Sequence, residues 1–401
     1  MEQIPRLDIL IYAHDGRGLG HVSRSIGVGM ALRRLFPELK VLFVTGSRLA
    51  QELIGPAPLD WLKLPSYATR VEGGKSRGIP GPSRYSDAEL GAIRAYELQH
   101  LVSLYRPRLV LVDHTPQGKH RELVSAISAG KALRTQWVLG VRGVVGEVPQ
   151  ARSDFAAELF AAHYRALIWY GDSRVLGPSH CRLLERHYGT QPVEVGYVVR
   201  LAELSCWQDR PAPPVESYAG TIAVPWLGEG SLSFLKALAA ALQKIPKAHG
   251  DWRIFLDAGA DPGVEQAISE LFRGLRNCRI ELPGGSYATA LSHSKTALVY
   301  GGYNSIMDML HVRLPGLVVI REMADDEQRI HLERILEVTG DQLTAVSETR
   351  VTADELQRVM LSNLGKSRAA SYAIATDGAA RAAEYLRGLL SEDRRQKTEA
   401  R

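Results

Sequence analysis

LDILIYAHDGRGLGHVSRSIGVGMALRRL, residues 7–35, contains the pattern that decides the fold. Its first part, LDILIYAH, is almost wholly apolar and predicts a buried strand. A glycine-rich turn follows, and Val22, Ile26 and Met30 then recur at helical spacing, which predicts a helix over 21–35. A strand that passes through a short glycine-rich turn into a helix is the first half of a βαβ unit.

The same alternation of apolar strands and helical stretches continues along the chain. Apolar strands separated by helices predict parallel sheets that are covered on both faces. We therefore expect an α/β fold with two tandem Rossmann-like, doubly wound domains. The expected strands are 7–14, 40–46, 108–114, 135–143, 165–172 and 192–199 in the first half, and 220–228, 251–259, 277–285, 295–302 and 314–320 in the second.

A proline-rich stretch separates the two halves. Pro211, Pro213 and Pro214 indicate a semi-rigid linker, and 401 residues are enough for two domains of about 200 residues each. Two doubly wound domains in tandem place the default ligand site in the cleft between them, at the carboxyl ends of the strands. The expected division is an N-terminal Rossmann-like domain over 1–199, a linker over 200–219, a C-terminal Rossmann-like domain over 220–365, and a C-terminal helix and tail over 366–401.

The composition is that of an ordinary soluble globular protein, with 45% hydrophobic and 23% charged residues. No apolar run approaches the roughly 18–20 residues that a membrane-spanning helix needs. The chain has three cysteines, Cys181, Cys206 and Cys278. An odd number of cysteines that are far apart in the sequence argues against a disulfide framework and a cysteine-based zinc site. The first residues do not resemble a signal peptide, so we expect a cytoplasmic protein.

Charge is divided unevenly between the halves. Residues 1–200 carry a net charge of +8 and residues 201–401 a net charge of −3. A basic first half predicts an anionic partner, and nucleic acid, anionic lipid and a phosphorylated substrate all have that property. We expect no nucleic acid, because the chain lacks interleaved basic and aromatic patches.

The turn in HDGRGLGHVSRS is suited to an anion. Gly16, Gly18 and Gly20 precede a helix whose N-terminus supplies exposed N–H groups and a partial positive charge. The turn does not match the dinucleotide fingerprint G-x-G-x-x-G, because His21 and Ser23 occupy the positions where the third glycine would stand. The alternative is a strand-to-helix turn that needs glycine for its backbone alone.

A second glycine turn lies in ALVYGGYNSIMDMLHVRLPGLVVI, residues 297–320. Here Asn304 or Ser305 is expected to cap a short helix. Asp308 lies opposite the apolar face of that helix by helical spacing. An acid near a helix N-terminus also complements the helix dipole, so Asp308 has a purely structural alternative.

The chain resembles GT-B glycosyltransferases that use nucleotide sugars. The resemblance is carried by four motifs, GGYNSIMDML, LPGLVVI, DDEQ and GLGHVSRS. The chain is most similar to the family of the peptidoglycan UDP-N-acetylglucosamine transferase, and within it to predicted bacterial glycosyltransferases with G-x-GHxxR and GGYN loops. The resemblance covers roughly residues 7–340.

This resemblance implies a role for several residues of the second half in binding a UDP-sugar donor. Asp308 matches the acid that binds the ribose hydroxyls, and one carboxylate can accept from both. The other matching residues are Gly301, Gly302, Asn304 and Ser305 in the turn that approaches the diphosphate, Gly228 and Gly230 in the loop that faces it, and Asp326, Glu327 and Gln328 in the loop that binds the donor sugar.

The chain departs from the family pattern at four places. Arg313 stands where the family has Gly before Leu-Pro, and Ile320 ends a strand that commonly ends in Pro. Glu327 replaces the first residue of the usual Gln-Gln pair, which leaves the donor sugar open. Asp308 is shorter by one methylene than the usual Glu.

An inverting sugar transfer needs a base for the acceptor hydroxyl and positive groups for the leaving diphosphate. His21 is the first candidate for the base, because its ordinary pKa of about 6.5 suits proton transfer. Its alternative is to cap the helix or bind a phosphate. Asp113, at the end of the strand LVLVD, is the second candidate, and it could equally cap the next helix.

Arg24 and Arg142 are expected to contact a phosphate or the acceptor, together with the loop glycines Gly18 and Gly20. Asp325 and Asp326 are adjacent rather than spaced for a metal ion, which predicts chemistry without a metal. We expect no cofactor apart from the UDP-sugar donor.

The sequence thus predicts an inverting, metal-independent glycosyltransferase. Its acceptor is unknown, and the basic first half suggests a lipid-linked or other anionic glycan at the inner face of the cell membrane. One alternative is a nucleotide-sugar hydrolase or epimerase on the same fold, and another is a protein that binds nucleotide sugars without catalysis.

Overall fold

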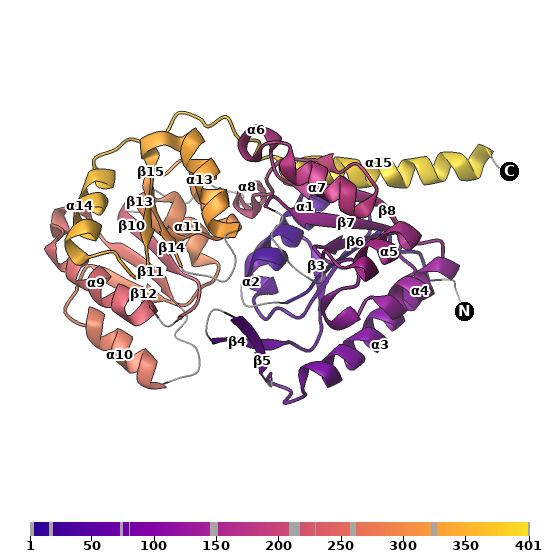
Figure 1. Ribbon diagram of the computed structural model, residues 1–401, viewed down its shortest axis with the longest axis horizontal. Coiled ribbons are helices and arrows are strands. Elements are labelled where there is room, and N and C mark those ends of the chain that lie inside the picture. Colours follow the sequence, from indigo (N-terminus) through magenta and orange to yellow (C-terminus); the bar gives the residue numbers. More distant parts are fainter. Residues whose placement is uncertain are drawn as a thin grey trace. The chain divides into compact units, whose positions relative to one another are not determined.

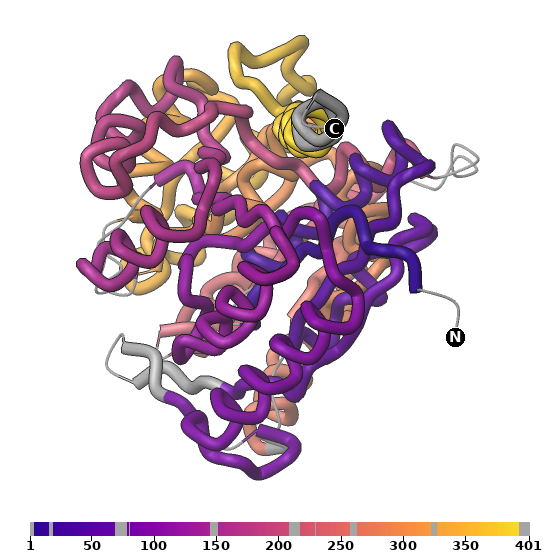
Figure 2. The backbone as a smooth tube through the Cα atoms, turned by 90° about the vertical axis from the view of Figure 1, so that its right-hand side faces the viewer, coloured from indigo at the N-terminus to yellow at the C-terminus, as the bar shows by residue number. Residues whose placement is uncertain are grey.

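The structure is a computed structural model whose chain divides into two compact units (Figures 1 and 2). Unit 1 comprises Met1–Arg70, Ser76–Trp207 and Ile374–Arg401, and unit 2 comprises Val71–Lys75 and Gln208–Ala373. The structure describes residues 4–15, 19–72, 75–79, 81–144, 151–207, 217–228, 230–256, 262–321 and 327–399.

Unit 1 contains a parallel sheet of seven strands in the order β3-β2-β1-β6-β7-β8-β9. Every residue of β1, β2 and β6 is buried, as expected for strands covered by helices on both faces. Ile9 of β1 pairs with Val41 of β2 and Leu109 of β6, so β1 lies between β2 and β6. The order of the strands along the sheet reverses its direction at this point. The strands are β1 (Ile9–Ala13), β2 (Val41–Thr45), β3 (Asp60–Lys63), β6 (Leu109–Asp113), β7 (Gln136–Arg142), β8 (Tyr164–Tyr170) and β9 (Val193–Glu194); β4 (Ala68–Glu72) and β5 (Lys75–Ile79) form a separate two-stranded sheet.

Helices connect these strands. The longest connection, α3, begins with a capping box in which Ser86 and Glu89 satisfy each other's backbone N–H groups. The helices of unit 1 are α1 (Gly20–Leu35), α2 (Ala50–Ile54), α3 (Asp87–Tyr105), α4 (Val124–Ala132), α5 (Asp154–His163), α6 (Ser173–Leu176), α7 (Ser179–Tyr188), α8 (Arg200–Ser205) and α15 (Gly378–Glu399), with a 3₁₀ turn at Lys119–Arg121.

Unit 2 repeats this architecture with six parallel strands in the order β12-β11-β10-β13-β14-β15. Its core is built around Trp252, Phe234 and Ile222, all of which are fully buried. The strands are β10 (Tyr218–Val224), β11 (Trp252–Leu256), β12 (Cys278–Glu281), β13 (Ser294–Tyr300), β14 (Gly316–Ile320) and β15 (Leu343–Ser347). The helices are α9 (Ser231–Lys244), α10 (Pro262–Phe272), α11 (Ser286–Ser292), α12 (Tyr303–Val312), α13 (Glu327–Thr339) and α14 (Ala353–Leu364), with 3₁₀ turns at Lys247–His249 and Gly340–Gln342.

Two doubly wound parallel sheets confirm the predicted fold class. The strand expected over 192–199 is shorter, because β9 contains only Val193 and Glu194. Gly196 follows with a φ of +84°, and Tyr197 donates its backbone N–H to Ala375 instead of continuing the sheet. The C-terminal segment therefore takes the place of the missing strand end.

The division into units differs from the predicted domain boundaries. Unit 1 continues to Trp207 because α8 packs on α1, and buried Arg200 donates to the Leu53 carbonyl at 2.9 Å. The helix α15, yellow in Figures 1 and 2, also belongs to unit 1 and packs on α1. The prolines on which the linker prediction rests lie outside the described residues.

None of the described helices has the length and apolar character that are needed to cross a membrane.

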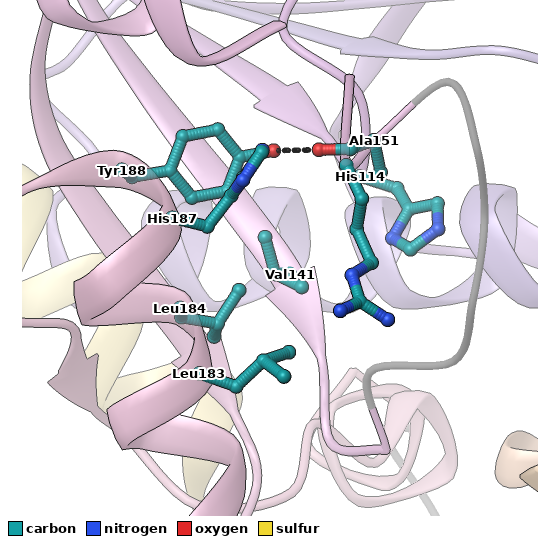
Figure 3. A pocket seen from close by; sticks show the side chains of 8 residues that line it. His114, Val141, Ala151, Leu183, Leu184, His187 and Tyr188 are labelled. Carbon is teal, nitrogen blue, oxygen red and sulfur yellow. Dashed lines mark hydrogen bonds between the residues drawn. The ribbon is translucent and has the colours of Figure 1, made fainter. Parts of the chain in front are cut away.

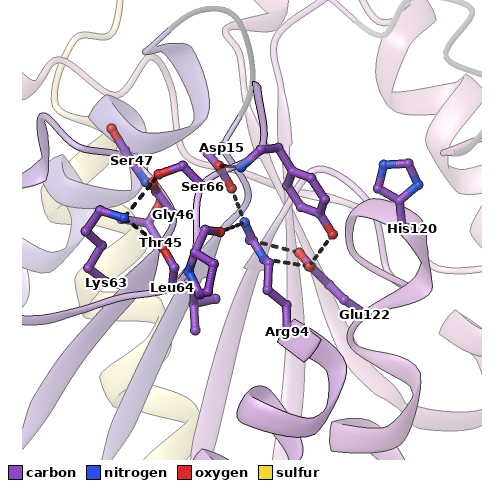
Figure 4. A network of polar contacts seen from close by, with 12 residues as sticks. Asp15, Thr45, Gly46, Ser47, Lys63, Leu64, Ser66, Arg94, His120 and Glu122 are labelled. Carbon is purple, nitrogen blue, oxygen red and sulfur yellow. Dashed lines mark hydrogen bonds and ion pairs between the residues drawn. The ribbon is translucent and has the colours of Figure 1, made fainter. Parts of the chain in front are cut away.

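A buried ion network stabilises the carboxyl end of the unit 1 sheet (Figure 4). Arg94 of α3 is fully buried between the carboxylates of Asp15 and Glu122. Its Nε lies 2.7 Å from an oxygen of Glu122, and Asp15 also accepts the backbone N–H of Tyr67 at 2.7 Å. Tyr12 and Tyr67 donate their hydroxyl groups to Glu122. This network holds the backbone directly after β1.

Replacing Arg94 by methionine should lower the free energy of unfolding by about 3–5 kcal/mol, because two carboxylates would stay buried without their countercharge. Chemical denaturation followed by circular dichroism measures this change. The matched control, Arg381→Met, removes an exposed ion pair on α15 and should change stability by less than about 1 kcal/mol. Equal effects of the two substitutions would contradict the role assigned to Arg94.

Candidate functional site

The first candidate site lies at the carboxyl ends of β1 and β6. These strands are parallel neighbours, so the residues that follow them come together at one edge of the sheet. Asp113 is the last residue of β6, and His21 lies in the first turn of α1, which follows β1. Gly20 is the first residue of that helix. The two residues predicted as candidate bases are therefore adjacent in the structure.

Asp113 is held by two partners from α1. Its Oδ2 lies 2.6 Å from Nδ1 of His21, and Nη2 of Arg24 lies 3.0 Å from each of its oxygens. The side chains of Asp113 and Arg24 are each 2% exposed, whereas that of His21 is 18% exposed. Arg24 thus pairs with Asp113, and its predicted contact with a phosphate stays a prediction.

These contacts determine which nitrogen of His21 can accept a proton. A carboxylate can only accept hydrogen bonds, so the proton on the imidazole lies on Nδ1, toward Asp113. The lone pair of the neutral ring is then on Nε2. Asp113 and Arg24 therefore leave one nitrogen of His21 able to act as a base.

The pKa values match this division of roles. Burial raises the pKa of Asp113, but Arg24 and His21 outweigh burial and lower it to about 2. Burial lowers the pKa of His21, against the opposing effect of Asp113. At neutral pH His21 is therefore uncharged and Asp113 is ionised. Asp113 is poorly suited to be the base and well suited to orient His21.

Two further histidines flank His21, and the sequence analysis did not identify them. The ring centroids of His14 and His21 are 4.3 Å apart, and those of His21 and His114 are 5.3 Å apart. Their signal in the sequence was their position, because His14 and His114 directly follow the buried strands β1 and β6. Arg142, at the end of β7, lies close enough to lower the pKa of His114, for which burial is the larger cause.

A small pocket adjoins this histidine cluster (Figure 3). Tyr188 of α7 donates its hydroxyl to the Ala151 carbonyl at 2.6 Å across one side of the pocket. His114 lies on the opposite side from Tyr188 (Figure 3). The lining residues are His114, Val141, Ala151, Arg152, Leu183, Leu184, His187 and Tyr188.

The second candidate site is the glycine turn of unit 2, between β13 and α12. A Cβ on Gly301 would lie 2.8 Å from the Ile320 side chain and 3.4 Å from Oε1 of Gln328, so the turn packs tightly beside Gln328. Gly302 is the N-cap of α12, and a Cβ there would meet nothing within 4 Å. An open backbone at a helix N-terminus is suited to an anion.

The predicted cap of this helix was wrong. Asn304 and Ser305 lie inside the first turn of α12, because the carbonyl of Gly302 already accepts the backbone N–H of Ile306 at 3.2 Å. Asp308, farther along the helix, is 6% exposed. Its predicted role on the ribose hydroxyls stays a prediction.

A buried network beside this turn was not predicted. Glu348, directly after β15, accepts from Nε of Arg321 at 2.7 Å, from Ser231 at 2.9 Å and from the Tyr300 hydroxyl at 2.8 Å. The guanidinium of Arg321 also lies 3.8 Å from the centre of the Trp226 ring. Strand β15 was not among the expected strands, so no position was predicted for Glu348, which follows it.

This network positions the predicted loop after β10. The backbone N–H of Gly228 donates to the Ser231 hydroxyl at 2.8 Å, and a Cβ on Gly230 would lie 3.6 Å from Glu348. Glu327 begins α13. The predicted residues Gly18 and Asp326 lie outside the described part of the chain. Gly301 and Gly302 directly follow β13, whereas Gly228 and Gly230 lie in the loop between β10 and α9 and Gln328 lies in the first turn of α13.

Within the described ranges, no group of three or more His, Cys, Asp or Glu side chains has an arrangement that could hold a metal ion.

Comparison with known proteins shows the fold. No protein-family model matches the chain, and no curated protein matches it in sequence. A UDP-GlcNAc 2-epimerase from Methanocaldococcus jannaschii superposes with a TM-score of 0.61 at 12% identity, over 96% of this chain and 99% of that one. The corresponding enzyme from Neisseria meningitidis, bound to UDP-GlcNAc, gives 0.59 at 12% identity, over 95% and 99%. The spinosyn rhamnosyltransferase SpnG with thymidine diphosphate gives 0.51 at 16% identity, over 96% of each chain.

These similarities, with the two parallel sheets, show that the chain has the GT-B fold. They include both glycosyltransferases and epimerases, so they do not choose between these activities.

The contact between Asp113 and His21 predicts a pKa change in a variant. The negative charge of Asp113 favours the protonated imidazole, so Asp113→Asn should lower the pKa of His21 further below 6.5. Imidazole resonances in ¹H–¹⁵N spectra recorded against pH measure this value. The matched control, Asp377→Asn on the α15 side of unit 1, should leave it unchanged. A higher or equal pKa in Asp113→Asn would contradict the contact.

Proposed function

We propose that the protein is an inverting glycosyltransferase that transfers a sugar from a UDP-sugar to an acceptor hydroxyl without a metal ion. The observation that carries the proposal is the contact of His21 Nδ1 with Asp113, which leaves Nε2 as the nitrogen that can accept a proton. This contact lies on a GT-B fold whose second unit has an open glycine turn at a helix N-terminus. Unit 1 then supplies the base, and unit 2 binds the donor.

In the proposed reaction, Nε2 of His21 takes the proton of the acceptor hydroxyl. The acceptor oxygen forms a bond to the anomeric carbon from the face opposite the diphosphate, and the bond from that carbon to the diphosphate oxygen breaks. Asp113 stabilises the imidazolium that forms on His21. Arg24 keeps Asp113 ionised, because its guanidinium binds both carboxylate oxygens.

On the donor side, the backbone N–H groups at the start of α12 would receive the diphosphate. Gly301 and Gly302 allow a close approach there, and the helix dipole stabilises the charge that develops on the leaving group. Asp308 would bind the ribose hydroxyls. Glu327 and Gln328 at the start of α13 would contact the sugar, and the position of Gln328 beside Gly301 supports this assignment.

The solved structures of similar fold support a nucleotide-sugar donor. Of those described above, the Neisseria meningitidis enzyme is bound to UDP-GlcNAc and SpnG to thymidine diphosphate. The choice of UDP rests on the resemblance of the sequence motifs.

Donor binding can be tested at Gly302 without disturbing the fold. Its φ is ordinary, and an added Cβ has open space around it, so Gly302→Ala should fold normally. The methyl group would occupy the space of the diphosphate, and we expect at least tenfold weaker binding of UDP. A thermal-shift titration measures this, because a ligand at about 100 times its dissociation constant adds about 2.7 kcal/mol.

Gly274→Ala is the matched control, since its Cβ also meets nothing within 4 Å. Gly274 precedes β12, which is at the edge of the sheet and three positions from β13 in the strand order. Unchanged UDP binding in Gly302→Ala, or binding of another nucleoside diphosphate in place of UDP, would contradict the donor assignment.

Catalysis can be tested at His21. We expect His21→Ala to lower kcat/KM by about 10²- to 10⁴-fold, the usual contribution of a general base, with UDP binding retained. The control His100→Ala removes an exposed imidazole on α3 and should leave turnover unchanged. Release of free sugar without an acceptor would indicate a hydrolase, and a changed sugar on UDP would indicate an epimerase. Turnover equal to that of the unmodified protein would exclude His21 as the base.

A further inference from the structure

His114 is a buried imidazole without a hydrogen-bond partner among the described residues. The residue is 4% exposed, and neither Nδ1 nor Nε2 has a partner there. Its backbone φ is +75°, a conformation that few residues other than glycine adopt. The backbone N–H of His114 donates to Gly140 at 2.7 Å, which holds the residue in this conformation. A buried polar group and a strained backbone at the same residue indicate a binding function.

The surroundings of His114 favour an anion. The cluster contains the guanidinium groups of Arg24 and Arg142 and the carboxylate of Asp113. Its net charge is therefore positive while its histidines are neutral. The charged and titratable groups around His114 come from several elements of unit 1. They are His14 after β1, His21 and Arg24 on α1, Asp113 at the end of β6, Arg142 at the end of β7, and Arg152 and His187 in the lining of the pocket.

The pocket of Figure 3 supplies a second observation. His114 is part of its lining, and Nε2 of His187 on α7 is also buried without a partner among the described residues. Arg152 lines the same pocket. Donors from three segments of unit 1 therefore line one small pocket.

We propose that His114 and Arg142 bind an anionic group of the sugar acceptor, a carboxylate or a phosphate, beside His21. This proposal rests on the proposed function, because His21 faces the acceptor hydroxyl in that reaction. An anionic group on the same acceptor, one or two bonds from the hydroxyl, would then lie within reach of the neighbouring ring.

The chemistry of imidazole gives this subsite a characteristic property. Neutral imidazole has one N–H donor, whereas imidazolium has two and carries a positive charge. An anion beside His114 stabilises the protonated form, so binding takes up a proton from solution. Affinity should therefore rise as the pH falls. Arginine alone would give no such dependence between pH 5.5 and 8.

Sulfate is the appropriate probe, because it remains a dianion over this range of pH. We would titrate the full chain with sulfate by calorimetry at pH 5.5 and pH 8, at constant ionic strength and in two buffers that differ in ionisation enthalpy. Sulfate should bind more tightly at pH 5.5 than at pH 8, and binding should take up protons from solution.

The test variant is His114→Asn, since asparagine tolerates positive φ and does not titrate. It should lose most of the dependence on pH. His100→Asn, on the exposed face of α3, is the matched control and should bind sulfate as the unmodified chain does. Thermal denaturation of each variant verifies that it is folded.

The outcomes separate this proposal from its rivals. Equal sulfate affinity and equal dependence on pH in His114→Asn and the unmodified chain would overturn it. Displacement of the His114-dependent sulfate by UDP would also overturn it, because the anion site would then belong to the donor. Sulfate binding does not need turnover, so a failure of the proposed transferase activity would be seen separately.

Discussion

The pairing of Asp113 with Arg24 and His21 is the interaction on which the unit 1 site depends. A carboxylate that is 2% exposed can stay ionised only if neighbouring groups compensate for the water that it has lost. Arg24 supplies the charge and His21 supplies an N–H, and both come from α1. The pairing therefore joins the first turn of α1 to the end of β6, selects the tautomer of His21 and keeps its ring in place.

The sequence was sufficient for the fold class and for the choice of several candidate residues. Apolar strands such as 40–46 and 108–114 are recognisable because a parallel sheet covered on both faces excludes polar residues from them. The ends of those strands then indicate where functional side chains collect. His21 and Asp113 were predicted as alternative bases, and the structure brings them together because β1 and β6 are neighbours in the sheet.

The remaining features depend on contacts that no local pattern encodes. The pairing of Arg24 with Asp113 was not predicted, because the pairing of side chains across elements is set by packing. β15 is half polar, so Glu348 and its contact with Arg321 had no local signal. The helix α15 follows unit 2 in the chain but belongs to unit 1, because it packs on α1. His14 and His114 did stand at strand ends, and that position could have identified them.

The configuration of the product tests the central claim most directly. With a UDP-sugar of α configuration and a suitable acceptor, the coupling constant of the anomeric proton in the NMR spectrum of the product distinguishes the two outcomes. A direct displacement assisted by His21 predicts a β-glycoside, with the anomeric centre inverted. An α-glycoside, or the formation of free sugar or an epimerised UDP-sugar without glycoside, would contradict the account.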